Sequence, residues 1–485
     1  MPVSRVRRAL SAAALALVAP LAAAGPTGGP LPQPVLAALD RAQVPPEAVV
    51  AIVQDVTGAP PRLAWRPEQP VNPASLMKLL TTFAALDLLG AAWTWSTPVW
   101  LQGSVRAGVL EGDLVIKGSG DPKLVVERVW QLLRRVQQLG VREIRGDIVL
   151  DRSAFAELPQ AAGDFDGEAL RPYNVRADAL LLNYRVIAYT FTPDPARGVA
   201  VISADPPLAG VTHHASVPLV TGPCEGWRGA LQADFTDPLQ ARFAGRFAAA
   251  CGEKSWSVAH GEPHRFDARA LAGMWNELGG RLGGVVRDGV APATPPSFES
   301  ISPPLAEIVR DINKHSNNVM AQQLFLTLGL TQRDSGTPEA ARAALRDWAA
   351  TRLGSTAALL VVDNGSGLSR DGRVSAALIA RLLLAAWASP VMPELMSSLP
   401  VAGVDGTLAT RRRPPTATTG RAHLKTGSLR DVAGVAGYVL SNSGRRYLVV
   451  TIANHANANA ARPAFEALVQ WAADDAAAAN VAIER

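Results

Sequence analysis

The stretch that decides the fold runs Asn72-Pro-Ala-Ser-Leu-Met-Lys-Leu-Leu-Thr-Thr-Phe-Ala-Ala-Leu-Asp-Leu-Leu-Gly90. Asn is a favoured helix N-cap and Pro suits the first helical position, so a helix is predicted to begin directly after Asn72. Apolar residues then recur at helical spacing as far as Gly90, a residue typical of a helix end. The pattern predicts one buried helix that carries Ser75 and Lys78 near its start.

Ser75 and Lys78 form an S-x-x-K pattern on one face of this helix, because residues three apart are neighbours on a helix surface. The N–H groups at a helix start are unpaired and lie at the positive end of the helix dipole, so negative charge on an oxygen near Ser75 is stabilised. A neutral Lys78 amine can accept the hydroxyl proton of Ser75. That needs a lowered Lys78 pKa, which burial and a second cation such as Lys425 favour.

Two more short motifs follow in order. Ser316-Asn-Asn318 has the form S-x-N, and Lys425-Thr-Gly427 is followed by Ser428. An S-x-x-K match alone is expected about once by chance in a chain of this size. The conjunction of three motifs, each present once and in this order, is the signature of β-lactamases and penicillin-binding proteins.

The second motif is predicted to lie on a short loop after a helix. From there the Ser316 hydroxyl can relay a proton between Lys78 and a leaving amine. The Asn318 amide offers both a donor and an acceptor to a substrate amide. These two residues are therefore predicted to complete the path of the proton and to hold the substrate.

The third motif opens a predicted strand. Gly427 has no side chain, so we expect a substrate backbone to lie close to it as an added strand. The hydroxyls of Thr426 and Ser428, with the Lys425 charge nearby, suit a terminal carboxylate. The Ser428 N–H is predicted to form an oxyanion hole with that of Ser75.

Elsewhere, apolar periodicity predicts strands and helices before and after an unlike middle region. Between residues 98 and 290, short apolar runs alternate with Gly, Pro and Asp, which predicts a strand-rich insertion with one helix near 268–282. The flanking sequence predicts strands at 49–53, 62–65, 423–429, 432–440 and 446–454, and helices at 305–312, before 328, at 338–353, 375–387 and 463–473.

Several longer segments resemble one family, the class C low-molecular-mass penicillin-binding proteins, which are D-alanyl-D-alanine carboxypeptidase/endopeptidases. The spacing agrees, because Ser75 and Ser316 lie 241 residues apart and in this family that gap holds two inserted domains. The segments that resemble the family are Ser302–Asn318, Asp363–Arg370, Gly118–Pro122 and Gly146–Asp151.

The resemblance implies an α+β fold of the penicillin-binding/β-lactamase-like serine transpeptidase kind, a five-stranded antiparallel sheet flanked by helices. Its catalytic domain would consist of residues 25–97 and 291–485, interrupted by an insertion of one or two smaller domains at 98–290. It implies no metal and no organic cofactor. The site residues that it implies are the acyl-enzyme nucleophile Ser75, the base Lys78, the proton relay Ser316 and the substrate contacts Asn318, Lys425, Thr426, Gly427 and Ser428.

The N-terminus reads as a secretory signal peptide over residues 1–24, with a basic head, an apolar middle and small residues at its end. Its removal lowers the formal net charge from +5 to +2, so no nucleic-acid partner is indicated. No later segment is predicted to cross a membrane. In an exported, periplasmic protein the two cysteines, Cys224 and Cys251, are predicted to form a disulfide, the alternative being two buried thiols.

These features predict a serine DD-peptidase that acts on peptidoglycan peptides ending in or cross-linked through D-Ala, with β-lactam antibiotics as covalent inhibitors. Two other functions stay open on the sequence. A β-lactamase would share the chemistry but needs a positioned deacylating water. A wall-binding or β-lactam-sensing protein would use a degenerate site, although all three motifs are intact.

Overall fold

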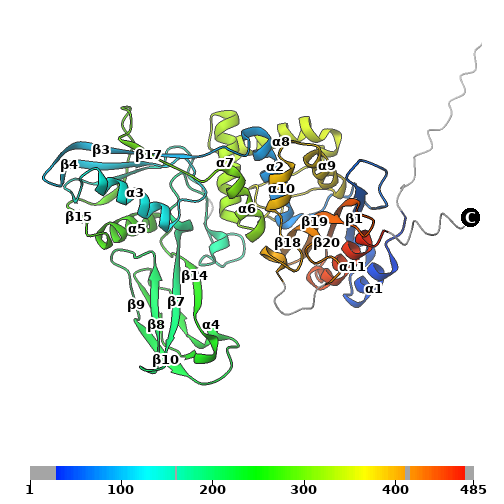
Figure 1. The fold of residues 1–485 in the computed structure, drawn as a ribbon, viewed down its shortest axis with the longest axis horizontal. Helices are drawn as coiled ribbons and strands as arrows, with labels where there is room; N and C mark the ends of the chain where they lie inside the picture. Colours follow the sequence, from blue (N-terminus) through cyan, green and yellow to red (C-terminus); the bar gives the residue numbers. More distant parts are fainter. Residues whose placement is uncertain (1–28, 159–160, 410–415, 476–485) are drawn as a thin grey trace, which may run out of the picture.

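The computed structural model describes residues 29–158, 161–409 and 416–475. The predicted signal peptide lies outside these residues. The chain forms a catalytic body, built from the two ends of the sequence, and an inserted region that projects from it as two parts (Figure 1). Strands far apart in the sequence join in the body, and this brings the three motifs together.

The sheet of the body has five strands in the order β18-β19-β20-β1-β2, all antiparallel. Ile52 on β1 lies opposite Ala64 on β2 and Val450 on β20, so the N-terminal hairpin extends a C-terminal meander. This confirms the predicted five-stranded sheet. Its strands are β1 (Val49–Asp55), β2 (Leu63–Trp65), β18 (Ala422–Leu429), β19 (Val432–Leu440) and β20 (Arg446–Asn454).

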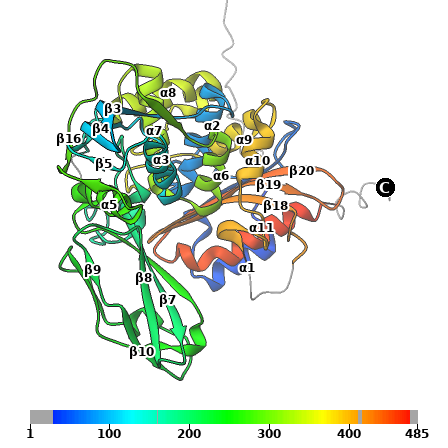
Figure 2. The same ribbon diagram turned by 60° about the vertical axis from the view of Figure 1, so that its left-hand side comes forward.

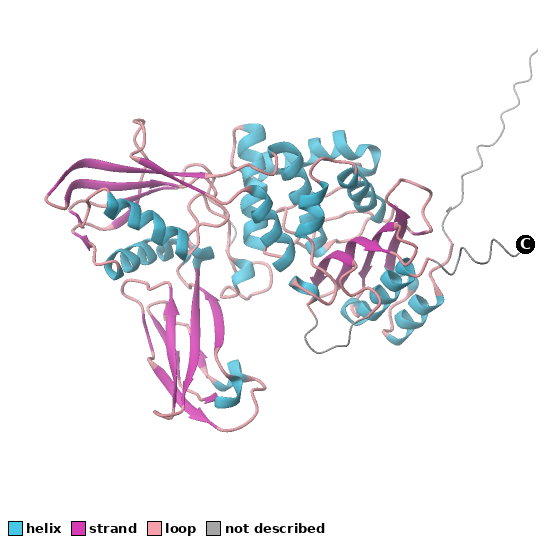
Figure 3. Cartoon of the chain, in the orientation of Figure 1, coloured by secondary structure: helices cyan, strands magenta, loops and turns pink. Residues whose placement is uncertain are grey.

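Helices cover both faces of this sheet (Figures 2 and 3). On one face α1 (Gln33–Arg41) packs beside α11 (Arg462–Ala473), and a buried cluster including Leu39, Val449 and Phe465 fills the space beneath them. The other face carries the larger core, which includes Phe83 and Tyr438. Its helices are α2 (Met77–Leu89), α6 (Leu305–His315), α7 (Asn318–Arg333), α8 (Pro338–Leu353), α9 (Ala376–Trp387) and α10 (Met392–Ser398).

Helix α7 joins the body to the inserted region. The side-chain amide of Gln323, which is fully buried, accepts from the Asp178 N–H and donates to the Asp178 carbonyl, at 2.9 Å each. This reciprocal pair of hydrogen bonds satisfies the backbone N–H and C=O of Asp178, in the inserted region, as a neighbouring β-strand would. The contact fixes the segment after residue 170 against the body.

The first part of the inserted region is a mixed sheet with two helices, not a purely strand-rich unit. The helix predicted near 268–282 lies at 263–277, and the helix at 126–138 was not predicted. Strand β17 pairs with β3, so this sheet includes residues beyond the predicted boundary at 290. Its elements are β3 (Ser96–Arg106), β4 (Val109–Lys117), α3 (Val126–Gln138), β5 (Glu143–Ile144), β6 (Ile148–Asp151), α5 (Pro263–Glu277), β15 (Arg281–Leu282), β16 (Val286–Asp288) and β17 (Phe298–Ile301).

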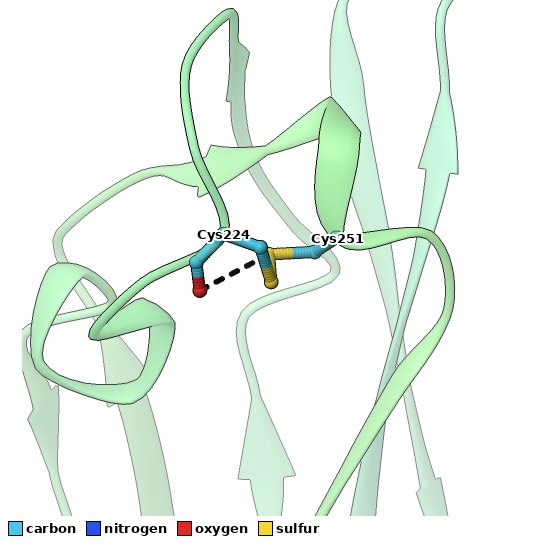
Figure 4. Close-up of a disulfide and its surroundings, with 2 residues drawn as sticks. All are labelled: Cys224 and Cys251. Carbon is cyan, nitrogen blue, oxygen red and sulfur yellow. Dashed lines mark hydrogen bonds between the residues drawn. A yellow bond between two sulfur atoms is a disulfide. The ribbon is translucent and has the colours of Figure 1, made fainter. Parts of the chain in front are cut away.

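The second part extends away from the body and holds the disulfide (Figure 1). Cys224 and Cys251 are bonded, as predicted, and they lie 27 residues apart in the sequence (Figure 4). The part has a five-stranded sheet, a three-stranded sheet and a short helix. Its elements are β7 (Val186–Asp194), β8 (Val199–Asp205), β9 (Thr212–His213), β10 (Ser216–Val220), α4 (Trp227–Ala230), β11 (Ala233–Asp234), β12 (Gln240–Phe243), β13 (Phe247–Ala248) and β14 (Lys254–Ala259).

A buried ionic network links the two inserted parts. Asp267 on α5 is fully buried and accepts from the guanidinium groups of Arg152 and Arg185 and from the Leu182 N–H. Arg152 also pairs with Asp178 at 2.8 Å. Because each buried charge has several partners, the network holds the segment around 178–185 in place.

Candidate active site

Ser75 lies in a 3₁₀ turn, Ala74–Leu76, that leads into α2 at Met77. The predicted α-helical start after Asn72 is therefore wrong by one turn. The Asn72 side chain caps the turn differently from the prediction, because its Oδ1 accepts from the Ala74 N–H at 2.8 Å. Ala74, directly before the nucleophile, has φ 47°, a left-handed conformation that is unfavourable for a residue with a Cβ.

The tight turn directs Ser75 toward a fully buried Lys78. The Lys78 Nζ lies 3.0 Å from Ser75 Oγ, 2.6 Å from Asn318 Oδ1 and 2.6 Å from the Ser366 carbonyl oxygen. The amide oxygen and the carbonyl oxygen can only accept. A neutral amine has two hydrogens and one lone pair, so bonds to these two acceptors leave the lone pair for the Ser75 hydroxyl.

The surroundings favour that neutral amine. Burial lowers the pKa of Lys78 well below its ordinary value of 10.5, and the charge of Lys425 lowers it further. Both effects penalise the charged form. The lowered pKa and the geometry of Lys78 both suit a general base for Ser75.

Ser316 ends α6 in a left-handed conformation, φ 55°, between that helix and α7. Lys425 Nζ donates to Ser316 Oγ at 2.9 Å and to the Thr426 carbonyl at 2.8 Å. Lys425 is fully buried, and burial lowers its pKa to about 7. The structure thus brings Ser316 and Lys425 together. The Lys425 amine is buried beside Ser316 and is not exposed at the edge of β18.

Strand β18 is the edge strand of the sheet beside Ser75. The Leu424 N–H donates to Pro400 at 2.9 Å and the Ala422 carbonyl accepts from Ala402 at 2.8 Å, so even-numbered residues direct their backbone groups away from β19. Because this direction alternates along an antiparallel strand, Thr426 and Ser428 present their N–H and C=O groups to the same outer side. The arrangement suits the predicted added strand and the predicted oxyanion donor.

The structure gives a further reason for glycine at position 427, besides the predicted approach of a substrate backbone. A Cβ there would lie 2.7 Å from the Pro73 carbonyl oxygen and 3.2 Å from Leu76 Cγ. Directly opposite it on β19, a Cβ on Gly434 would lie 3.2 Å from Leu76 Cδ1. This pair of glycines lets the Ser75 turn dock on the sheet, so Gly427 positions the nucleophile from below.

The resemblance predicts that the Asp363–Arg370 segment forms a Gly-rich loop near the site, but sequence reasoning missed which groups of this loop and of Asn454 complete the site. The Ser366 carbonyl belongs to the Asp363–Arg370 loop, where Gly367 leaves no room for a Cβ against the Ala74 carbonyl. Asn454 and Asn72 exchange two hydrogen bonds, at 2.7 and 3.0 Å, which fixes the entry to the Ser75 turn. No local sequence pattern predicts these contacts, because they join residues that lie 288 and 382 positions apart in the chain.

The inserted region also reaches the site. Asn318 Nδ2 donates to the Tyr173 carbonyl at 3.3 Å, which orients the Asn318 amide with its oxygen toward Lys78. Tyr173 itself belongs to a 3₁₀ turn, Pro172–Asn174, and its hydroxyl donates to Asp166 at 2.9 Å. The site therefore depends on one backbone group from outside the body.

A cavity of about 980 Å³ opens above these residues. Ser75, Ser316 and the three residues Thr426–Ser428 line it, and it continues between the outer side of β18 and helix α11. In the described part of the chain, no group of three His, Cys, Asp or Glu side chains is arranged to hold a metal ion. Within the same residues, no helix has both the length and the apolar character of a membrane span.

Comparison with known proteins agrees with this description. The family model for D-Ala-D-Ala carboxypeptidase 3 (S13) matches residues 35–475. A D-alanyl-D-alanine carboxypeptidase of Actinomadura sp. (strain R39) is 32% identical over 414 residues, which cover 80% of this chain and 74% of that protein. The D-alanyl-D-alanine carboxypeptidase DacB of Haemophilus influenzae is 24% identical over 392 residues, covering 79% and 80%.

Solved structures share the fold. The crystal structure of penicillin binding protein 4 (dacB) from Haemophilus influenzae superposes with a TM-score of 0.68 at 21% identity, covering 90% of this chain and 99% of that one. Its complex with a β-lactam superposes with a TM-score of 0.62 at 20% identity, covering 87% and 96%. The fold and the serine–lysine site are those of a penicillin-binding serine peptidase. The chain belongs to the D-Ala-D-Ala carboxypeptidase 3 (S13) family.

Proposed function

We propose that the protein hydrolyses D-alanyl peptide bonds of peptidoglycan stem peptides through an acyl-enzyme on Ser75. The observation that carries the proposal is the environment of Lys78, whose two obligate acceptors leave its lone pair to Ser75. Relatives named as D-alanyl-D-alanine carboxypeptidases support this substrate class. The β-lactamase and non-catalytic alternatives are not favoured by these relatives.

In the proposed reaction, Ser75 Oγ bonds to the carbonyl carbon of the penultimate D-Ala while its proton passes to Lys78 Nζ. The N–H groups of Ser75 and Ser428 stabilise the oxyanion. The C–N bond then breaks, and the proton reaches the leaving amine by way of Ser316, whose Oγ accepts from Lys425 Nζ at 2.9 Å. Water later hydrolyses the ester, which frees the shortened peptide and Ser75.

A fluorescent penicillin and a D-Ala-D-Ala peptide test the proposal together. We expect a long-lived label on the protein and release of D-Ala from the peptide. A label that is lost within seconds, with release of opened antibiotic, would indicate a β-lactamase. A stable label without D-Ala release would indicate a β-lactam-sensing protein.

We also propose that the chain is exported to the periplasm after cleavage of residues 1–24. The disulfide supports export, because such bonds persist in oxidising compartments. N-terminal sequencing of protein from a periplasmic fraction tests this, and a mature chain that still begins at Met1 would contradict it.

A further inference from the structure

An arginine side chain, that of Arg462, lies at the C-terminal end of strand β18, where it contacts Ser428. Arg462 is the first residue of α11 and is exposed to solvent. Its Nη2 donates to Ser428 Oγ at 3.1 Å and to Asn459 Oδ1 at 3.2 Å. Asn459 in turn donates to the Leu429 carbonyl at 2.7 Å, which holds the arginine against the end of the strand.

The partners of Arg462 are both neutral. Among the residues that the structure describes, no carboxylate oxygen lies within 4.0 Å of its guanidinium group. A guanidinium carries five N–H donors in a fork that fits a carboxylate in two parallel hydrogen bonds. The first turn of a helix is also an unfavourable place for a positive charge, because the helix dipole is positive there. Within the residues that the structure describes, Arg462 thus has guanidinium donors and a charge that no ion pair engages.

The same cavity contains Arg462 and the site. Ser75, Ser316, Thr426, Ser428 and Arg462 all line it. The hydroxyls of Thr426 and Ser428 project from one face of β18, since side chains two apart on a strand lie on the same face. The Thr426 hydroxyl already forms a hydrogen bond with the Thr407 hydroxyl at 2.8 Å. The Ser428 hydroxyl and the Arg462 guanidinium are therefore the pair at the C-terminal end of β18.

The two lysines of the site are placed for other work. Lys78 and Lys425 are fully buried, and their amines are engaged with Ser75, Asn318, Ser316 and backbone carbonyls. An arginine, in contrast, stays charged at every pH at which the protein is folded. Among the described residues that line the cavity, Arg462 is therefore the one that offers a ligand carboxylate an exposed guanidinium.

We propose that Arg462, together with the Ser428 hydroxyl, binds the terminal carboxylate of the D-amino acid that leaves during cleavage. This rests on the proposed function and deepens it. The carboxylate is one residue from the scissile carbonyl, about 3.5 Å of chain, so a carbonyl held at the Ser428 N–H keeps it beside the Ser428 side chain. Arg462 is a specificity-determining residue that favours substrates with a free C-terminus.

Two matched peptides test the proposal, one ending in D-Ala-D-Ala with a free carboxylate and one with the C-terminal amide. For Arg462→Ala we expect kcat/KM on the acid to fall by about ten- to a hundredfold, as loss of a charge-assisted pair of hydrogen bonds implies. We expect the amide to change less than twofold. Arg462→Lys should recover part of the loss, because it restores the charge without the fork.

Arg265→Ala is the control, since Arg265 is an exposed arginine in the first turn of α5, outside the cavity. It should change neither substrate, and the thermal midpoints of all variants should agree. Equal losses on acid and amide, or no loss on the acid, would overturn the role of Arg462. If the wild type turned over neither peptide, the proposed function would fail instead, so the two failures are distinguishable.

Discussion

The catalytic body and the inserted region are held together by different kinds of contact. In the body, Ser75, Ser316 and Lys425 come from three distant segments and meet on one sheet edge. In the outer part of the inserted region, the strongest tie is a disulfide that closes a loop of 27 residues. From this difference we expect substitutions in the body to change mainly the rate of the reaction. Substitutions in the inserted region should change mainly the free energy of unfolding.

The largest effect on turnover is expected for Ser75→Ala, which tests directly whether the body carries the chemistry. Without the Oγ no acyl-enzyme forms, so D-Ala release and penicillin labelling should fall below detection. Ser75 is a small side chain at a cavity wall, so the thermal midpoint should stay within a few degrees. Mass measurement after incubation with penicillin decides it. A stable adduct on the purified variant would mean that another residue is the nucleophile.

Gly427→Ala should cost about a hundredfold in kcat/KM, because the added Cβ displaces the Ser75 turn from the sheet. This Cβ would lie 2.7 Å from the Pro73 carbonyl, so the strand and the Ser75 turn must separate. A shift of about 1 Å in a catalytic group costs on that order. Gly229→Ala in the inserted region is the matched control, because a Cβ there meets nothing within 4 Å. Activity within threefold of wild type for Gly427→Ala would refute the docking role.

Lys425→Met should lower kcat/KM by at least about tenfold and move the acidic limb of its pH profile to higher pH. The charge of Lys425 lowers the pKa of Lys78, so its removal raises that pKa and delays formation of the neutral base as pH increases. Profiles of kcat/KM from pH 5 to 10 measure this. An unchanged acidic limb would show that Lys425 does not act on Lys78.

The same variant has a stability signature of known sign. Burial lowers the pKa of Lys425 from 10.5 to about 7, so between these pH values the folded state binds fewer protons than the unfolded state. Stability of the wild type should therefore rise relative to Lys425→Met as pH increases from about 7 to 10. Denaturant unfolding at pH 7 and pH 9.5 tests this, and a difference that stays constant would contradict it.

Much of the body was predictable because its elements have strong local signals. Strands β19 and β20 and helix α8 lie at the predicted residues, since apolar periodicity and turn residues define them locally. The three motifs named side chains that the structure brings into contact, Ser75 with Lys78 and Ser316 with Lys425. The sequence did not predict which face of β18 each side chain takes, because that depends on the register with β19. Lys425 was therefore expected beside a terminal carboxylate, whereas its amine is buried and donates to Ser316 and to the Thr426 carbonyl.

The inserted region was predicted less well for a related reason. Helix α3, Val-Glu-Arg-Val-Trp-Gln-Leu-Leu-Arg-Arg-Val-Gln-Gln138, is amphipathic, but the surrounding Gly, Pro and Asp residues suggested strands and turns. The contact of Tyr173 with Asn318 uses a backbone carbonyl, which any residue type supplies. The buried Asp267 network joins residues from 152 to 267, and no local pattern marks them as partners.

That network gives the next test, in which stability should change more than chemistry. Asp267→Asn removes the fully buried carboxylate that Arg152 and Arg185 share and leaves them sharing the Asp178 carboxylate, and removing one partner of a buried pair costs about 3–5 kcal/mol. Asp288→Asn breaks another bond of Arg152, but the Asp288 side chain is 70% exposed, so about 1 kcal/mol or less is expected. Urea unfolding compares the two. Below the unfolding transition, kcat/KM of both should stay within about fivefold of wild type, since among the described residues the network reaches helix α7 of the body through the hydrogen bond of Asp178 to Gln323.

The smallest effect on turnover is expected at the disulfide, farthest along the inserted region. Replacing both cysteines with serine removes the closure of a 27-residue loop, which corresponds to about 3.5 kcal/mol of unfolded-state entropy. Cys251 also packs with the core that includes Phe247 and Phe191, so a serine hydroxyl there adds a cost of its own. We therefore expect earlier unfolding of this part and faster proteolysis within 186–259, yet an unchanged rate of penicillin acylation at 25 °C. Wild type treated with a reductant is the control, because it opens the same loop without changing the side-chain volume. If acylation slowed in parallel with proteolytic opening, the outer part would be coupled to Ser75, and the division between a chemical body and a structural insertion would fail. An unchanged rate would instead leave the Tyr173–Asn318 hydrogen bond as the contact through which the inserted region acts on the site. There the Tyr173 carbonyl accepts from Asn318, whose Oδ1 accepts from Lys78.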